Sequence, residues 1–352
     1  MGCTDDTGTS GDKGTSGNMG KSGDVGKSGD GNYIIAELEI NGDNKNTFVR
    51  ILNSYEESVR KYIISKKRNE SAYSNEDELK DGTITINNNK ISFDYTHYFD
   101  KEGKYTIKYT FNHPITKADF MFSDCRAFTK LDLTHFKTES ITNMWSMFRD
   151  CGAKIIDVSQ FNTENVTNMA GMVEACVNVE ELDVSKFNTQ KVTDMNSMFT
   201  ICTKLKDLDL SNFDTKNVSN MSNMFSGCES LQTLDLSSFN TEKVTTMESM
   251  FLSCKSLINV EVGSFNTKNV KSFFTMFSNC ESIQSIHLSN FTTENLKEAT
   301  NMFSGCINLS YIDLSNFHIK DANLVNIFLD CDKLMKSNIR TEDQKILDEF
   351  PE

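Results

Sequence analysis

Hydrophobic and polar residues follow one another in the same order many times along the middle of the chain. One clear copy, Leu205–Cys228, reads LKDLDLSNFDTKNVSNMSNMFSGC. In its first part, Leu208 and Leu210 alternate with polar residues, which is typical of a half-buried strand. The apolar residues of its last part recur at steps of three and four: Val218, Met221, Met224, Phe225 and Cys228. That spacing favours one face of a short helix, so each copy predicts a strand, a turn, a short helix and a turn.

The copies follow at a nearly constant period. Nine cysteines mark it, with gaps of 25 or 26 residues: Cys125, Cys151, Cys176, Cys202, Cys228, Cys254, Cys280, Cys306 and Cys331. A single unit of this size cannot bury its apolar face, whereas stacked units bury continuous ladders. Strands lie about 4.8 Å apart and helices are near 10 Å wide. The pattern therefore predicts a curved α/β solenoid of about eight repeats, with the strands on its concave face.

The repeat phrase LDLSxFxTxxVTxMxxMFxxC carries a resemblance. It resembles the BspA-like leucine-rich repeat surface proteins of bacteria and some unicellular eukaryotes. The resemblance covers about 60% of the chain, and it implies a leucine-rich-repeat-like solenoid displayed at a surface, in adhesion or recognition. This sequence departs from the pattern in places: Ala153 and Lys154 precede a copy that is one residue short, and Glu261 and His287 replace the strand aspartate.

The remaining segments do not repeat. Residues 33–114 hold several short alternating stretches, such as Ala36–Ile40 and Tyr105–Phe111, with a short helix expected near Glu56–Ile64. We expect a small β-rich domain that caps the first repeat of a solenoid spanning 115–331, because an open end exposes core and a strand edge. Residues 332–352 are expected to cap the other end, with Glu342–Phe350 as an amphipathic helix.

The first 32 residues are rich in glycine and poor in apolar side chains. We expect a disordered, flexible stalk, since such a segment cannot bury enough surface to offset its ordering entropy. The sequence opens Met1-Gly2-Cys3, so lipid on Gly2 or Cys3 is one interpretation and an ordinary soluble tail is the other. The expected location is a membrane, through this anchor and at the cell surface, with the cytoplasm as the alternative.

Composition narrows the classes of function. The 352 residues carry 36 Lys and Arg against 50 Asp and Glu, a net charge of −14. This charge argues against nucleic-acid binding, which needs a basic face. No apolar run is long enough to form a transmembrane helix, and no apolar segment follows the start as in a secretory signal.

The candidate binding residues are the outward side chains of the predicted strands. Inward positions are fixed by packing, whereas these positions vary and are free to encode a partner. The candidates are Glu181, Asp183, Asp207, Asp209, Asp235, Glu261, His287, Tyr311 and Asp313. An alternative role for the aspartates is structural, as partners of the flanking serines. If a ligand binds there, its chemistry should be partly basic.

The sequence offers no constellation of catalytic residues, so we expect a protein that is not an enzyme and has no cofactor. The regular cysteines lack the CxxC pairs of zinc sites and are interpreted as small buried core residues. The expected function is a recognition or adhesion module that binds a protein or glycan on its concave strand face. The alternative is an assembly protein, with the repeats as a spacer and the Gly-X-Y register of the first residues as an oligomerisation stalk.

Overall fold

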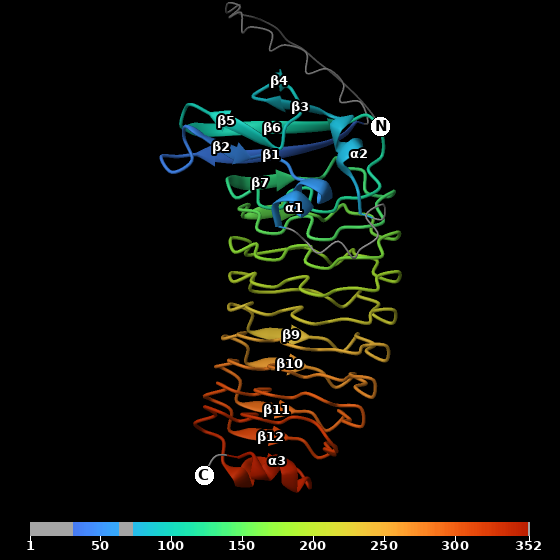
Figure 1. Ribbon diagram of the computed structural model, residues 1–352, viewed down its shortest axis with the longest axis vertical. Coiled ribbons are helices and arrows are strands. Elements are labelled where there is room, and N and C mark those ends of the chain that lie inside the picture. The colour runs from blue at the N-terminus through green and yellow to red at the C-terminus, as the bar shows by residue number, and fades with distance from the viewer. Residues whose placement is uncertain (1–30, 63–72, 351–352) are drawn as a thin grey trace, which may run out of the picture. The chain divides into compact units, whose positions relative to one another are not determined.

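The structure, a computed structural model, describes residues 31–62 and 73–350 (Figure 1). Asn32–Glu352 form one compact unit. The described part is rich in strands and poor in helices, and its strands form several small sheets, none of them closed. The predicted stalk at 1–32 lies almost wholly outside the described residues.

The non-repeating segment contains six described strands and two described helices. Their bounds are β1 Asn32–Ile40, β2 Thr47–Arg50, α1 Tyr55–Tyr62, α2 Glu76–Lys80, β3 Thr83–Ile86, β4 Asn89–Ile91, β5 Thr96–Phe99 and β6 Gly103–Phe111. Alternation in β1 buries Ala36, Leu38 and Ile40 against the core, as the period of two requires. The expected helix and most of the expected strands are present, while β2, β5 and α2 had no clear signal in the sequence.

One sheet joins this segment to the repeats. Its strand order is β4-β3-β6-β1-β7-β8, in which β7 (Phe128–Asp132) and β8 (Ile155–Asp157) belong to the first two repeats. β1 runs antiparallel to both β6 and β7, whereas β7 and β8 are parallel. The predicted capping domain and the start of the repeats therefore share a single sheet.

Each repeat forms one coil of the chain, and successive coils lie side by side (Figure 1). The strand segments of later coils pair in parallel within two further sheets. These strands are β9 Thr233–Asp235, β10 Asn259–Glu261, β11 Ser285–His287 and β12 Tyr311–Asp313. The chain ends with a 3-10 helix, η2 (Lys336–Asn338), then β13 (Ile339–Arg340), which pairs in parallel with β12, and the helix α3 (Gln344–Asp348).

The helix predicted in each repeat is wrong. In the coil of Leu205–Cys228, the segment after Val218 forms successive turns, in which Met224 donates to Met221, Ser226 to Asn223 and Cys228 to Phe225. Asn223 and Gly227 have φ of 59° and 72°, in the left-handed region that an α-helix excludes. Equivalent pairs of left-handed residues, four positions apart, recur in the other coils. Successive turns bury the same positions that suggested a helix.

Between these turns, alternate backbone amides leave the coil and bond to the next one. We call this stretch of each coil, such as 218–228, the turn segment. The amides of Asn223, Phe225 and Gly227 donate to the carbonyl oxygens of Glu248, Met250 and Leu252, at 2.8, 3.0 and 2.7 Å. The cost of the left-handed residues, about 1–2 kcal/mol each for a residue other than glycine, is offset by these bonds between coils.

Side chains form ladders through the stack. Phenylalanine rings beside the strands, from Phe161 to Phe291, lie 6.0–6.5 Å apart, and those of the turn segments, from Phe199 to Phe303, lie 5.1–5.8 Å apart. The turn segments therefore stack at a spacing well below the width of a helix, about 10 Å. The width of helices was the reason to expect a concave strand face, and that reason does not hold.

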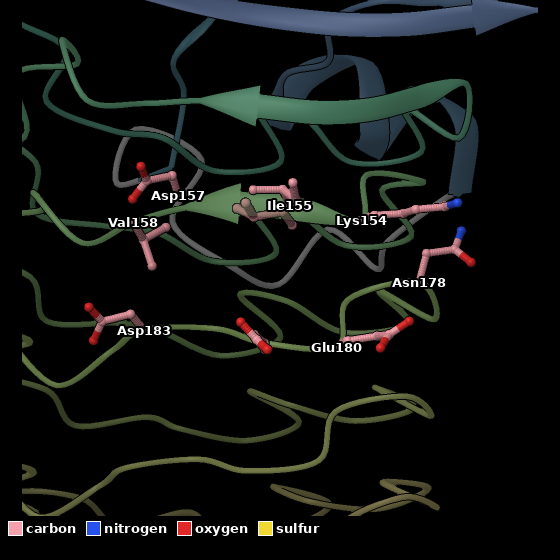
Figure 2. Close-up of a pocket in the computed structure, with 9 residues that line it drawn as sticks. Lys154, Ile155, Asp157, Val158, Asn178, Glu180 and Asp183 are labelled. Atoms are coloured by element: carbon pink, nitrogen blue, oxygen red, sulfur yellow. The ribbon is translucent and has the colours of Figure 1, made fainter.

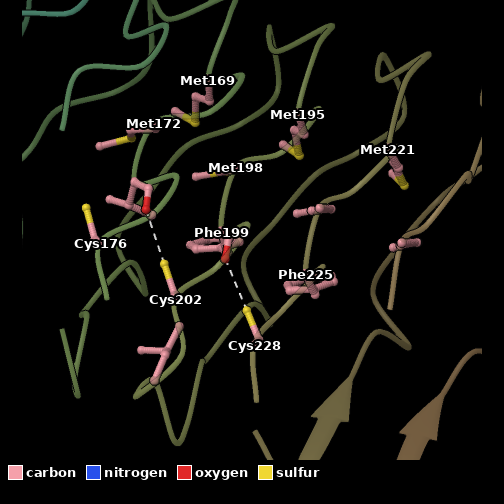
Figure 3. Close-up of a cluster of buried hydrophobic side chains, with 14 of the residues drawn as sticks. Met169, Met172, Cys176, Met195, Met198, Phe199, Cys202, Met221, Phe225 and Cys228 are labelled. Atoms are coloured by element: carbon pink, nitrogen blue, oxygen red, sulfur yellow. Dashed lines mark hydrogen bonds between the residues drawn. The ribbon is translucent and has the colours of Figure 1, made fainter. Parts of the chain in front are cut away.

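Buried polar atoms also connect neighbouring coils. The hydroxyl of Thr215 donates to the carbonyl oxygen of Asn240 at 2.9 Å and accepts its amide at 2.8 Å. The thiol of Cys228 donates to the carbonyl oxygen of Phe199 at 3.1 Å (Figure 3). Burial raises the pKa of Cys228 well above its ordinary value, so the thiol stays protonated. These contacts give the cysteine ladder a packing role.

Two asparagines replace the coil that is missing before the first repeat. In every other turn segment, the amides of the preceding coil satisfy the carbonyl oxygens at this edge. Here Asn75 Nδ2 donates to the carbonyls of Lys117 and Asp119, at 3.3 and 2.9 Å. The amide of Asn53 donates to Met121 and its side chain to Ser123, at 2.9 and 3.1 Å. The edge is thus closed without another coil.

Candidate binding face

The predicted site residues lie on one side of the coils, which we call the strand face, in two columns. The first column includes Glu181, Asp207 and Tyr311, and the second lies two residues later in each coil. The second column contains Asp183, Asp209, Asp235, Glu261, His287 and Asp313. Parallel pairing brings Glu261 opposite Asp235 and His287 opposite Asp313.

The aspartates of the second column have a structural role as well as an exposed charge. One carboxylate oxygen of Asp183 accepts the backbone amide and the hydroxyl of Ser185, at 3.1 and 2.6 Å. Asp209 and Asp235 accept the amides of Ser211 and Ser237 in the same way. The serine side chain and amide hold the pKa of each of these three carboxyls below its ordinary value. The predicted aspartate–serine network is confirmed, and it leaves the second carboxylate oxygen for solvent or a partner.

The strand ladder is interrupted where acidic residues occupy both columns. Residues 181–183 and 207–209 form no strand, and no backbone bond among the described residues joins Ile155–Asp157 to Glu181–Asp183. These two coils have Glu181 and Asp207 where later coils have Thr233, Asn259 and Ser285. Glu181 and Asp207, like Asp183 and Asp209, occupy equivalent positions on these two neighbouring coils, and like charges placed opposite one another destabilise strand pairing.

A groove of about 450 Å³ lies at the first interruption, between β8 and residues 180–183 (Figure 2). Its apolar surface comes from β8 and the residue after it: Ile155 is 53% exposed in an outward position, and Ile156 and Val158 are buried. Asp157 and Asp183 lie at one end of the groove (Figure 2). The groove therefore combines an apolar wall with two carboxylates.

The other end of the groove has mixed charge. Lys154, Asn178 and Glu180 lie there (Figure 2). Glu180 accepts a 2.8 Å bond from Lys206, which holds the pKa of Glu180 below its ordinary value and raises that of Lys206. Glu181 also lines the groove, and among the described residues it forms no ion pair in the structure. Asp157 and Asp183, at the first end, form no ion pair among the described residues, so the two ends of the groove differ in charge.

The C-terminal part of the face has different chemistry. The rings of His287 and Tyr311 lie 5.5 Å apart in neighbouring strands, so the predicted aromatic anchor is next to an imidazole. Asp313 is buried and paired with Arg340 of β13 at 3.1 Å. Asp313 is therefore less available to a partner than the aspartates of the central coils.

Sequence reasoning missed the residues that make the groove. Ile155, Lys154, Asn178 and Glu180 were not among the candidates. A signal was present, because Ile155 is the aliphatic residue in a column that elsewhere is polar or aromatic, and it belongs to the copy that is one residue short. The interruption of the strands depends on neighbouring coils and could not be read from one copy.

Two other findings concern anchoring and metals. Gly2 and Cys3, the predicted lipidation residues, lie outside the described residues. Within residues 31–62 and 73–350, no helix has the length and apolar character to span a bilayer. The same residues contain no cluster of three or more His, Cys, Asp or Glu side chains arranged to hold a metal ion.

Comparison with known proteins identifies the repeats. Three overlapping segments, 116–234, 176–288 and 227–341, match a family model described as "Mycoplasma protein of unknown function, DUF285". No curated protein matches the chain significantly. The matched segments cover the coils from the first turn segment to β13, which is more than half of the chain. Because the match covers the repeats and more than half of the chain, the chain belongs to the DUF285 family.

Proposed function

We propose that the chain is a non-enzymatic recognition module, displayed at a cell surface, that binds a protein or glycan through its strand face. The observation that carries the proposal is the contrast between invariant and variable positions. Inward residues repeat as Leu, Phe, Met and Cys in nearly every coil, while the outward residues of the first column change from coil to coil. A stiff array of variable side chains is the arrangement that repeat proteins use for binding.

The proposed architecture is a leucine-rich-repeat-like solenoid of the BspA-like type. Its support is the 26-residue period, the parallel strand pairs between consecutive coils and the repeat phrase itself. This type of solenoid is expected to have a helix in each repeat, whereas the turn segments here form successive turns. The proposal therefore concerns the stacking of coils rather than a helical outer layer.

The proposed partner is partly basic. Glu181, Asp183, Asp207 and Asp209 lie on consecutive coils, and such a field attracts cationic surfaces and accelerates their encounter. His287 and Tyr311 supply an aromatic contact at the other end.

Arrays of defined glycans and of defined acidic, neutral and basic peptides test this function. The purified chain is compared with the charge reversal Asp207→Lys/Asp209→Lys. We expect selective binding by the parent chain, weaker binding in the variant and similar melting temperatures. Binding that is identical in both proteins would place recognition elsewhere, and no selective binding on either array would contradict the function.

Surface display is proposed to depend on lipid at Gly2 or Cys3. Fractionation of cells from the native host tests it, with Cys3→Ser expected to move the protein from membranes to the soluble fraction. Equal partitioning of variant and parent would remove the anchor from the proposal. A trimer that disappears when residues 1–32 are deleted would instead favour the assembly role.

A further inference from the structure

The interrupted strand ladder suggests which chemical group the strand face recognises, and this inference rests on the proposed function. At the groove between β8 and residues 180–183, backbone pairing between coils is absent and side chains line the opening (Figure 2). A hollow with one apolar wall favours a ligand with an apolar part.

We propose that this groove binds an arginine side chain carried by an extended segment of a partner protein. The aliphatic stem lies along Ile155, the exposed apolar residue of the groove, and the guanidinium lies between Asp157 and Asp183. Long basic side chains combine an apolar stem with a charged end, which matches the order of surfaces along the groove.

The state of the two aspartates favours a guanidinium. Asp157 and Asp183 each use one carboxylate oxygen, Oδ1, for the serine two residues later, at 2.6 Å to the hydroxyl. The other carboxylate oxygen of each aspartate can accept a hydrogen bond from a partner. The planar guanidinium presents several donors in fixed directions and can satisfy two carboxylates at once. The serine bonds hold both carboxylates in place before a partner arrives, which lowers the ordering cost of binding.

The same face contains a matched comparison site. A hollow of about 300 Å³ lies between the coils of residues 208–211 and 235–238, and it is flanked by Asp209 and Asp235, each of which accepts the amide of the serine two residues later on Oδ1. Its outward neighbours are Asp207 and Thr233 rather than an isoleucine. The two hollows thus share the aspartate pair and differ in the apolar wall.

Fluorescence anisotropy with a labelled nine-residue peptide of alternating serine and arginine tests the proposal at physiological salt. We expect Asp157→Asn/Asp183→Asn to weaken binding by at least about tenfold, because asparagine keeps the serine contact and removes the charge. Asp209→Asn/Asp235→Asn makes the same change in charge at the comparison site and should weaken binding by less than about threefold. Ile155→Thr should weaken it by about threefold through lost apolar contact.

Four outcomes would overturn the proposal. If Asp157→Asn/Asp183→Asn and Asp209→Asn/Asp235→Asn weakened binding equally, only the overall negative charge of the strand face would matter. Equal binding of a peptide with citrulline in place of arginine would exclude a charged group. Spermine can be added at the same concentration of positive charge as the peptide. Complete displacement of the peptide would then indicate that the ligand is a free polyamine. If the arrays find a partner that none of the groove variants affects, this inference fails while the proposed function stands.

Discussion

The turn segments and the strand face differ in how they hold the coils together. Every second amide of a turn segment, such as Asn223, Phe225 and Gly227, bonds to the next coil. On the strand face, pairing between coils is confined to stretches of two or three residues and is interrupted in the central coils. The fold is therefore stabilised mainly on the turn side, and the strand face is free to carry charge that would destabilise a continuous sheet.

The largest expected effect comes from the aromatic ladder of the turn segments. Phe225 is fully buried between Phe199 and Phe251, with ring centroids 5.7 and 5.8 Å away. Phe225→Ala should lower the free energy of unfolding by about 3–5 kcal/mol through lost burial and a cavity. Urea unfolding followed by circular dichroism measures it, with Asp209→Ala on the strand face of the same coil as the control. Similar losses for both variants would contradict the comparison.

The second prediction concerns the edge closed by asparagine. Asn75→Leu removes the donor to the carbonyls of Lys117 and Asp119 and should cost about 1–3 kcal/mol, because buried acceptors lose their partner. Asn217→Leu, which removes an exposed 2.8 Å bond to Gln190, is the matched control and should cost little. Hydrogen exchange should accelerate in the first coil of Asn75→Leu. Unchanged exchange there would mean that the edge needs no side-chain cap.

The third prediction is a dependence on pH at the same edge. Asp119 is buried, both carboxylate oxygens lack a hydrogen-bond partner among the described residues, and burial raises its pKa well above the ordinary value of 3.8. Because the pKa of Asp119 is higher in the folded than in the unfolded protein, its ionisation lowers the stability of the fold as the pH rises above 3.8. Asp119→Asn should therefore melt higher than the parent at pH 7, with the difference shrinking towards pH 4. A difference that is the same at both pH values would contradict the assignment.

The smallest expected effect tests why the strands are interrupted. Thr233 of β9 occupies the position in its coil that Asp207 occupies in the preceding coil, so Asp207→Thr gives both coils the same residue there. It should stabilise the protein by about 0.2–1 kcal/mol and slow hydrogen exchange at 207–209, since one source of repulsion is removed. Thr233→Asp is the reverse change and should weaken the pairing of β9 with β10. Exchange that is unaffected by either change would exclude charge as the cause.

The sequence by itself determined the period, the buried positions and the family resemblance. The spacing of Cys125 to Cys331 and the apolar ladders depend on one copy matching the next, which is visible along the chain. The match of residues 116–341 to the DUF285 family supports the repeat interpretation. The aspartate–serine contacts were also predictable, because Asp183 and Ser185 are two residues apart.

Only the tertiary structure decided what the second half of each repeat becomes. Val218, Met221 and Phe225 are buried equally well by a helix or by successive turns, so their spacing could not separate the two. The choice depends on bonds such as Asn223 to Glu248, which exist only when the next coil is present. The groove beside Ile155 has the same origin, since it lies where residues 155–157 and 181–183 of neighbouring coils do not pair, and pairing between coils cannot be seen within one repeat.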